Sequence, residues 1–504
     1  MDIRTKGGLL YMKNWESVLP EEVGLSSKGL LEYLEQVEKQ GVELHSVKVL
    51  RHGKLAMTAN FAPYDDRTPH MLFSLSKSFC SAAAGFAVQE GLLQWDSKVV
   101  EVLDEYAPEN PSEWLKSVTL HHLLCMGSGL KEESDGVAGK GVQEWAKAVL
   151  ACDNAREPGT YFHYNSHGTY LVSCMVQKVT GQTVRDYLIP RLFVPLGIPV
   201  PYWSCSPEKV NCGGWGLFLT SDSIARFGQC LLQKGMWEGR QVLPLEWLEK
   251  ATVSQIDNSN GQKDPENEWH QGYGYQFWRT RGNRYRGDGA FGQICMVSPE
   301  KDMVVAVTAG VDDMGKEMRL MHEYLFPAAD MEPGGEDDQK ALQEKLASLS
   351  CKWPEDDGSG RAADGIFKNK DFTIYARETG NMLYVRLKDA DTELELTAGK
   401  DRPSLFAMNP GLFSETATTW AAQYGWKEGR LHLVARNLNG PQRTGCAGHL
   451  CRWKNRGGYV QVSVLHSVYW GIGKRIIRTA AGNFLAAILE GIWPTGSPIP
   501  AWRT

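Results

Sequence analysis

The chain has 504 residues, a length that fits two or three domains. With 42% hydrophobic and 23% charged residues, its composition is typical of a globular protein. Its formal net charge of −6 provides no basic field that would attract a nucleic acid, so we do not expect a nucleic-acid-binding protein. No stretch of about 18 uncharged apolar residues is present, so we expect no membrane-spanning helix.

Cysteine usage and the N-terminal segment bear on the cellular compartment. The eleven cysteines have no C-x-x-C spacing, which favours reduced, mostly buried thiols over a disulfide framework or a zinc site. Residues 1–17 contain no apolar run long enough for the core of a signal peptide, and we treat them as an N-terminal extension. We therefore expect a cytoplasmic protein without a metal or other cofactor.

A first domain, expected over residues 18–328, mixes strands and helices. A helix is predicted between Ser26 and Gly41, because its leucines and a valine fall on one face. Strands at both ends of the domain predict an antiparallel sheet closed by the two ends, with a helical layer. The further predicted elements are a β-hairpin at 47–57, a buried helix from Leu75 to Glu90, helices at 143–151, 167–180, 221–235 and 245–253, and a second hairpin at 292–310.

The composition changes near residue 329. Residues 329–350 are acidic and contain glycine and proline, which predicts a linker that ends in a short helix over 340–349. Residues 351–451 then hold runs of alternating apolar and polar residues, which predict a small β-rich domain. The clearest of these runs lie at 372–376, 382–387, 392–397 and 430–435.

Residues 452–504 form a tail with seven Lys and Arg residues against one acid, Glu490. Within it, residues 474–493 could form a basic amphipathic helix that lies on a membrane surface or on a partner. A helix packed on its own protein, or an end produced by an altered reading frame, would account for the same pattern.

The stretch FSLSKSF at 73–79 carries a nucleophile and a base. Ser74 and Lys77 are three residues apart at the start of a predicted helix, which places the amine and the hydroxyl on one face. A serine hydroxyl needs an adjacent base, and a lysine serves as one when desolvation depresses its pKa. S-x-x-K alone also occurs by chance in ordinary capped helices.

Two further segments could complete such a site. In EPGTYFHYNSHGTY (157–170), Tyr164 could transfer a proton to or from Ser74, with a pKa lowered by a neighbouring ammonium group; the alternative is a tyrosine that fills a loop-to-helix junction. In YRGDGAFGQICMV (285–297), glycines allow close backbone approach, so a strand N–H could join the Ser74 N–H in an oxyanion hole. The alternative is a glycine-rich hairpin end.

These three motifs occur in the order and spacing of the serine β-lactamase-like hydrolases, which the chain resembles over about residues 18–326. That family includes class C β-lactamases, D-alanyl-D-alanine peptidases, family VIII esterases and 6-aminohexanoate-dimer hydrolases. The likeness continues in TLHHLLCMGSGL (119–130), in residues 179–198 and 213–244, and in YGYQFW (273–278). It implies an α+β fold with a β-lactamase/transpeptidase-like antiparallel sheet flanked by helices, an all-helical insertion at about 90–280, and here a small C-terminal all-β domain.

The resemblance also implies roles for individual residues. Ser74 corresponds to the acylated nucleophile, Lys77 to its base, and Tyr164 to the tyrosine that exchanges protons with the nucleophile and the leaving group. Alignment on the glycines makes the Ala290 N–H the second oxyanion donor. The candidate substrate-binding and oxyanion residues are Ala290, Gly289, Ser166, Asn165 and Gln293.

Two departures from the family pattern affect the expected substrate. The tyrosine motif ends in Ser166 instead of asparagine, and a serine cannot do the two-sided hydrogen bonding of an amide. The cation of the third motif is missing, and Asp288 lies nearby, so recognition of a substrate carboxylate is weak unless Arg284 or Arg286 substitutes. The pattern therefore resembles the esterase and aminohexanoate-hydrolase branch, and we expect a small ester or amide substrate. The alternatives are β-lactamase or D-alanyl-D-alanine peptidase activity, or a ligand-binding sensor without turnover.

Other conspicuous side chains have structural explanations. His121 and His122 adjoin an apolar run and are typical of a helix start. His163 and His167 have zinc-capable spacing, but no third ligand is evident. Three tryptophans could line an apolar acyl or alcohol pocket, although aromatic residues in a core are the more common case: Trp203, Trp215 and Trp278.

Overall fold

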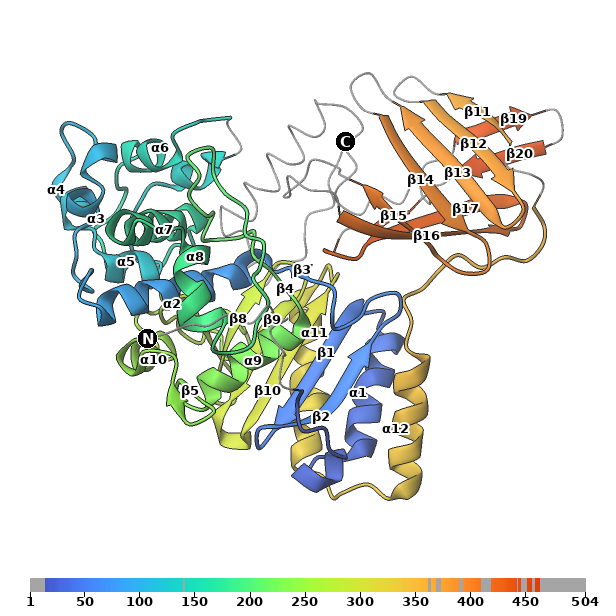
Figure 1. Ribbon diagram of the computed structural model, residues 1–504, viewed down its shortest axis with the longest axis horizontal. Helices are drawn as coiled ribbons and strands as arrows, with labels where there is room; N and C mark the ends of the chain where they lie inside the picture. Colours follow the sequence, from blue (N-terminus) through green and yellow to red (C-terminus); the bar gives the residue numbers. More distant parts are fainter. Residues whose placement is uncertain are drawn as a thin grey trace, which may run out of the picture.

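The computed structural model describes residues 14–462, except for 139–140, 361–363, 369–372, 389–392, 409–417, 442, 446–450 and 456–457. The basic segment 474–493 and most of the expected N-terminal extension lie outside the described residues. Among the described residues, no helix is both long and apolar enough to cross a membrane. Figure 1 shows a helical layer, a central sheet and a second sheet formed by the C-terminal part of the chain.

The central sheet is antiparallel and joins the two ends of the first domain, as predicted. Its six strands have the order β2-β1-β10-β9-β8-β7, so the first hairpin lies directly beside the last one. Along β10, Met303, Val305 and Val307 face one core and Val304 and Ala306 face the other, because successive side chains alternate. The strands are β1 (Leu44–Arg51), β2 (Lys54–Asn60), β7 (Trp278–Thr280), β8 (Arg284–Gly289), β9 (Gln293–Ser298) and β10 (Met303–Ala309).

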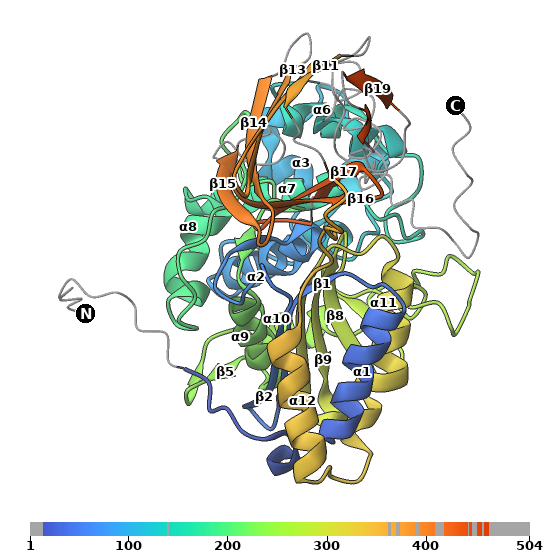
Figure 2. The same ribbon diagram turned by 90° about the vertical axis from the view of Figure 1, so that its right-hand side faces the viewer.

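One face of this sheet is covered by helices from both ends of the domain: α1 (Ser27–Lys39), α11 (Met314–Leu320) and α12 (Glu336–Ser348) (Figure 2). Helix α12 differs from the predicted linker and short helix. It begins at Glu336 because three acidic residues in its first turn suit the positive end of a helix, and it buries Leu342 in the core shared with α1. The domain boundary near residue 329 stays a prediction.

Helix α2 (Ser76–Gln89) lies between the other face of the sheet and the helical layer. It is buried on nearly all sides, as its small residues predict, and a Cβ on Gly85 would overlap the Trp247 side chain. The other helices of this layer are α3 (Val99–Val102), α4 (Glu113–Ser117), α5 (Leu120–Leu124), α6 (Trp145–Ala151), α7 (Ser166–Thr180), α8 (Val184–Leu188), α9 (Ser221–Leu232) and α10 (Leu245–Ala251).

The insertion between about 90 and 280 is not entirely helical, which corrects the prediction. Strand β4 (Phe218–Leu219) pairs with β3 (His70–Met71), and β5 (Met236–Trp237) pairs with β6 (Arg240–Gln241). Pairs of two residues are too short to give a period-2 signal in the sequence.

The C-terminal part of the chain forms a largely antiparallel eight-stranded sheet, as its alternating runs predict. The predicted runs correspond to β12, β13, β14 and β17. Strand β16 was missed because residues 420–426 (WAAQYGW) do not alternate between apolar and polar residues. All of them except Gln423 are buried, so both faces of the strand are covered. The strands are β11 (Gly365–Lys368), β12 (Thr373–Thr379), β13 (Met382–Lys388), β14 (Glu393–Gly399), β15 (Ser404–Met408), β16 (Thr418–Lys427), β17 (Arg430–Asn437) and β18 (Arg443–Gly445), followed by the separate pair β19 (Cys451–Asn455) and β20 (Gly458–Val462).

The two sheets are joined by contacts close to the chemical motifs of the first domain. The Tyr64 hydroxyl donates to the Asn437 carbonyl oxygen over 3.2 Å, and the Met71 N–H donates to the Asn439 carbonyl oxygen over 2.8 Å. Arg436 forms a buried ion pair with Glu43 at 2.6 Å. The C-terminal sheet is thereby anchored on the segment that leads to Ser74.

Candidate active site

Ser74 lies in a tight turn that precedes α2. The 3-10 turn η2 (Phe73–Leu75) places the hydroxyl at the start of the helix, where Ser74 is 8% exposed. Phe73 has a φ of 47°, in the left-handed region that a bulky residue rarely adopts. Such conformations are maintained by surrounding structure and are common at functional sites.

Lys77 points at Ser74 from one turn further along the helix, as the spacing predicts. Its Nζ donates to Ser74 Oγ at 3.0 Å, to Ser166 Oγ at 2.9 Å and to the Gly214 carbonyl oxygen at 2.8 Å. Burial lowers the pKa of Lys77 to about 7, against the opposing attraction of Asp135 and Asp288. A substantial fraction of the amine is therefore neutral at neutral pH and available as a base.

Tyr164 completes the group around the nucleophile. Its hydroxyl is hydrogen-bonded to Ser74, and its ring lies 4.7 Å from Lys77 Nζ and stacks on Trp278 at 5.4 Å. The predicted lowering of its pKa is wrong: burial, and then the nearby Asp288 carboxylate, raise the pKa of Tyr164 well above the usual value. Desolvation exceeds any effect of the ammonium group, so the phenol keeps its proton at neutral pH.

Asp135 was missed by the sequence analysis. It lies in the turn η4 (Glu132–Gly136), is fully buried, and accepts the Ser166 N–H at 3.1 Å. Its second oxygen lies 3.2 Å from His163 Nε2. Burial raises the pKa of Asp135 to about 6, although His163 and Lys77 favour its charged form. The sequence EESDG reads as an ordinary acidic surface turn, and no signal in it indicates burial.

Asn165 and Ser166 have different roles. The Asn165 side chain caps α7 by accepting the Gly168 N–H at 2.7 Å and donates to Ser134 Oγ at 2.6 Å. Asn165 is 1% exposed, so it fixes the start of α7 from the buried side and does not face a substrate. Ser166 Oγ instead accepts from Lys77 Nζ, so Ser166 lies within the candidate catalytic group and helps to hold the amine in place.

The glycine-rich third motif lies against the nucleophile, as predicted. A Cβ on Gly289 would overlap the Leu72 carbonyl oxygen and come within 3.1 Å of the Ser74 nitrogen, so only glycine allows this approach. Ala290 follows in the turn that joins β8 to β9. Gln293 is fully buried and holds this turn by donating to the carbonyl oxygens of Ala290 at 3.1 Å and Ala309 at 2.8 Å.

Neither arginine near the third motif substitutes for the missing cation, because both are engaged elsewhere. Arg286 is fully buried and donates from Nε to Asp288 at 3.0 Å. Arg284 donates to Ser298 Oγ at 3.2 Å and packs on Phe326. Asp288 also accepts from Trp269 Nε1 at 3.2 Å. Asp288 and Arg286 thus form a buried ion pair, which leaves no uncompensated positive charge at this position for a substrate carboxylate.

The remaining candidate side chains have local partners. His167 Nε2 accepts the Ala138 N–H at 3.2 Å, and His122 caps α5 together with Thr119. Trp203 is buried and donates to the Trp215 carbonyl oxygen at 3.0 Å. Among the described residues, no cluster of three or more His, Cys, Asp or Glu side chains is arranged to hold a metal ion.

Comparisons with known proteins show which family the chain resembles. The family model described as Beta-lactamase matches residues 34–329. The chain is 26% identical over 276 residues to the 6-aminohexanoate-dimer hydrolase of Paenarthrobacter ureafaciens, covering 49% of this chain and 67% of that protein. It is 27% identical over 203 residues to penicillin-binding protein 4 of Amycolatopsis lactamdurans, covering 34% of this chain and 52% of that protein. The matches thus span about half to two thirds of these curated relatives.

A solved structure supports the same fold. A Bacillus anthracis protein described as a 6-aminohexanoate-dimer hydrolase superposes with a TM-score of 0.51 at 18% identity, covering 63% of this chain and 87% of that one.

Proposed function

Since the chain belongs to the beta-lactamase family, we propose that it is a serine hydrolase that cleaves a small ester or amide through an acyl-enzyme. One observation carries the proposal: Lys77 Nζ lies 3.0 Å from Ser74 Oγ in a buried site that lowers the pKa of this lysine to about 7. A base beside the nucleophile serves acyl transfer, and ligand binding alone does not require it.

In the acylation step, the Ser74 hydroxyl gives its proton to neutral Lys77 while Oγ attacks the substrate carbonyl carbon. The oxyanion accepts hydrogen bonds from the N–H groups of Ser74 and Ala290. The bond to the leaving group then breaks, and the leaving oxygen or nitrogen takes the proton of the Tyr164 hydroxyl.

Deacylation reverses these roles with water. The Tyr164 phenolate, a strong base because its pKa is raised, takes a proton from the water that attacks the acyl carbon. Ser74 Oγ leaves with the proton held by the Lys77 ammonium group. The acid is released, and every group returns to its initial state.

The charges around the site support an uncharged ester or amide over a β-lactam or a D-alanyl peptide. Both of those substrates carry a carboxylate beside the reacting group, whereas Asp288 is buried near Lys77 and Tyr164, and Arg284 and Arg286 have protein partners. β-Lactamase or peptidase activity is the alternative within the same chemistry. A sensor that is acylated without turnover is the alternative outside it.

The test combines labelling and turnover. Intact-protein mass is measured after incubation with a fluorophosphonate, and p-nitrophenol release is followed with p-nitrophenyl acetate. We expect one adduct and steady turnover for the wild type, and neither for Ser74→Ala.

Ser81→Ala is the matched control, because Ser81 is a buried serine of the same helix whose hydroxyl donates to the Tyr275 carbonyl oxygen at 2.8 Å. It should keep both the adduct and the turnover. A folded wild type without adduct or turnover would contradict the proposal, and an adduct without turnover would favour the sensor.

A further inference from the structure

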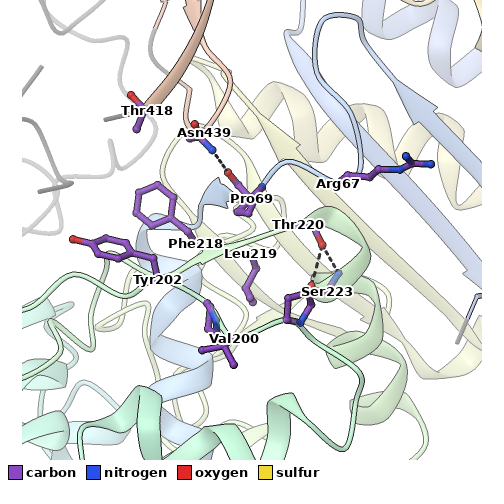
Figure 3. Close-up of a pocket in the computed structure, with 12 residues that line it drawn as sticks. Arg67, Pro69, Val200, Tyr202, Phe218, Leu219, Thr220, Ser223, Thr418 and Asn439 are labelled. Atoms are coloured by element: carbon purple, nitrogen blue, oxygen red, sulfur yellow. Dashed lines mark hydrogen bonds between the residues drawn. The ribbon is translucent and has the colours of Figure 1, made fainter. Parts of the chain in front are cut away.

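A pocket of about 320 Å³ lies at strand β4, where the first domain meets the C-terminal sheet. Its apolar wall comes from Pro199, Val200, Pro201, Tyr202, Phe218 and Leu219, and we call it the Phe218 pocket. Figure 3 shows the side chains of this wall below Thr418 and Asn439, which come from the C-terminal part of the chain. The volume is at the lower end of the range of about 300–1,000 Å³ for small-molecule sites.

The Phe218 pocket is close to the nucleophile. Phe218 pairs in register with Met71, and the three residues from Met71 to Ser74 span at most about 11 Å of backbone. The Phe218 side chain also packs in one cluster with Phe73, which precedes Ser74, and with Ala290, the proposed oxyanion donor. A substrate chain of up to about eight carbon atoms therefore spans the backbone distance between the reacting carbonyl and the pocket.

The pocket is held in shape by both parts of the chain. Asn439 donates from Nδ2 to the Pro69 carbonyl oxygen at 2.8 Å, and its Oδ1 accepts the Thr419 N–H at 2.8 Å. On the opposite side, Pro199 and Pro201 restrict the backbone around Val200. The rings of Tyr202 and Phe218 meet edge to face at 5.5 Å. A preformed cavity of this kind binds a ligand without a large cost of ordering its walls.

The chemistry of the wall indicates an uncharged apolar ligand. Val200 is 60% exposed, which leaves a branched apolar side chain at the edge of an apolar hollow. Apolar surface gathered in a concave site is typical of ligand binding. Arg67 contributes to the lining, but its side chain points away from the other labelled residues in Figure 3. A carboxylate at the end of the substrate would therefore gain little binding energy in this pocket.

We propose that the Phe218 pocket is a subsite for an apolar chain attached to the reacting carbonyl or to its leaving atom. This inference rests on the proposed hydrolase function and adds the substrate class: esters or amides with an aliphatic or aromatic chain of several carbon atoms. The C-terminal sheet takes part in substrate binding because Thr418 and Asn439 form one side of the subsite.

The test compares chain lengths in two arms. One arm uses p-nitrophenyl esters from acetate to octanoate, which vary the acyl chain, and the other uses acetate esters of alcohols from ethanol to octanol, which vary the leaving group. In the arm whose chain enters the pocket, kcat/KM of the wild type should rise about fourfold for each methylene group that becomes buried.

The decisive variants are at Val200, which is exposed and lies outside the catalytic group. Val200→Trp should fill the pocket and remove the dependence of kcat/KM on chain length, and Val200→Ser should weaken the dependence without filling the space. Val194→Trp is the matched control, since Val194 is 41% exposed and lies outside the pocket. It should retain the wild-type profile.

The outcomes separate the two proposals. Hydrolysis of acetate esters with no dependence on chain length in either arm would overturn the subsite and leave the hydrolase function standing. A dependence that Val200→Trp and Val194→Trp alter equally would also overturn it. No hydrolysis of any ester, together with no fluorophosphonate adduct, would overturn the proposed function itself.

Discussion

The charge of Asp135 helps to set the pH at which Lys77 becomes a base. Ser166 lies between them, with its Oγ 2.9 Å from Lys77 Nζ and its N–H 3.1 Å from Asp135. Two unit charges about 6 Å apart interact by about 2.8 kcal/mol at an effective dielectric constant of about 20, or about two pKa units. Asp135→Asn removes this attraction and keeps an oxygen for the Ser166 N–H. The pKa of Lys77, now about 7, should therefore fall further.

The assay is the pH profile of kcat/KM for p-nitrophenyl acetate. Protonated Lys77 is not a base, so the acid limb of the wild type should lie near pH 7. In Asp135→Asn this limb should move down by about one to two units, so the variant is more active than the wild type at about pH 6. Glu132→Gln, an exposed acid in the same turn, should leave the limb in place. An acid limb of Asp135→Asn that stays in place or moves to higher pH would refute the reasoning.

Three further substitutions test the geometry. Tyr164→Phe keeps the stacked ring but removes the proton donor, so hydrolysis of ethyl acetate should fall about 10²–10⁴-fold. For p-nitrophenyl acetate, whose leaving group needs no proton, kcat/KM reports acylation and should fall far less, although deacylation of the shared acetyl-enzyme slows for both esters. Equal losses of kcat/KM for the two esters would contradict the assigned role. Gly289→Ala should lower kcat/KM about 10²-fold and also destabilise the fold by about 1–3 kcal/mol, since its Cβ overlaps the Leu72 carbonyl oxygen and displaces the turn that holds Ser74. Unchanged kinetics would exclude that close approach. Gly85→Ala should destabilise by about 1–3 kcal/mol in denaturant unfolding because its Cβ overlaps Trp247. Gly335→Ala, at the N-cap of α12 with open space around it, should cost less, and equal losses would contradict the packing.

Much of the catalytic group could be predicted because its members are encoded locally. Ser74 and Lys77 are one helical turn apart, and helix geometry alone brings their side chains together. Two hairpins of the central sheet, β1–β2 and β9–β10, were also predicted, since in each case two strand-like runs flank a turn signal.

The parts that could not be predicted depend on contacts between distant segments. The Gly214 carbonyl oxygen that accepts from Lys77 is 137 residues away along the chain, and a backbone acceptor leaves no signature in the sequence. Asp135 is polar by sequence and fully buried in the structure. The predicted direction of the Tyr164 pKa shift was wrong for the same reason. The sequence indicates which groups are neighbours, whereas only the structure shows how deeply they are buried.

Burial in one site favours both a neutral base, Lys77, and a protonated acid, Tyr164. Desolvation disfavours the charged form of any group, and it is the largest cause of the pKa shifts of both Lys77 and Tyr164. The charged form of lysine is the protonated one, whereas that of tyrosine is the deprotonated one, so the same site favours a neutral amine and a protonated phenol.

These are the states that the proposed chemistry requires of the base for Ser74 and the acid for the leaving group. Asp288, which is paired with Arg286, also raises the pKa of Tyr164 and so helps to keep this acid protonated. Arg286, whose Nε donates to Asp288 at 3.0 Å, offsets part of that negative charge. The burial of Tyr164 together with this ion pair therefore determines how firmly the phenol holds its proton.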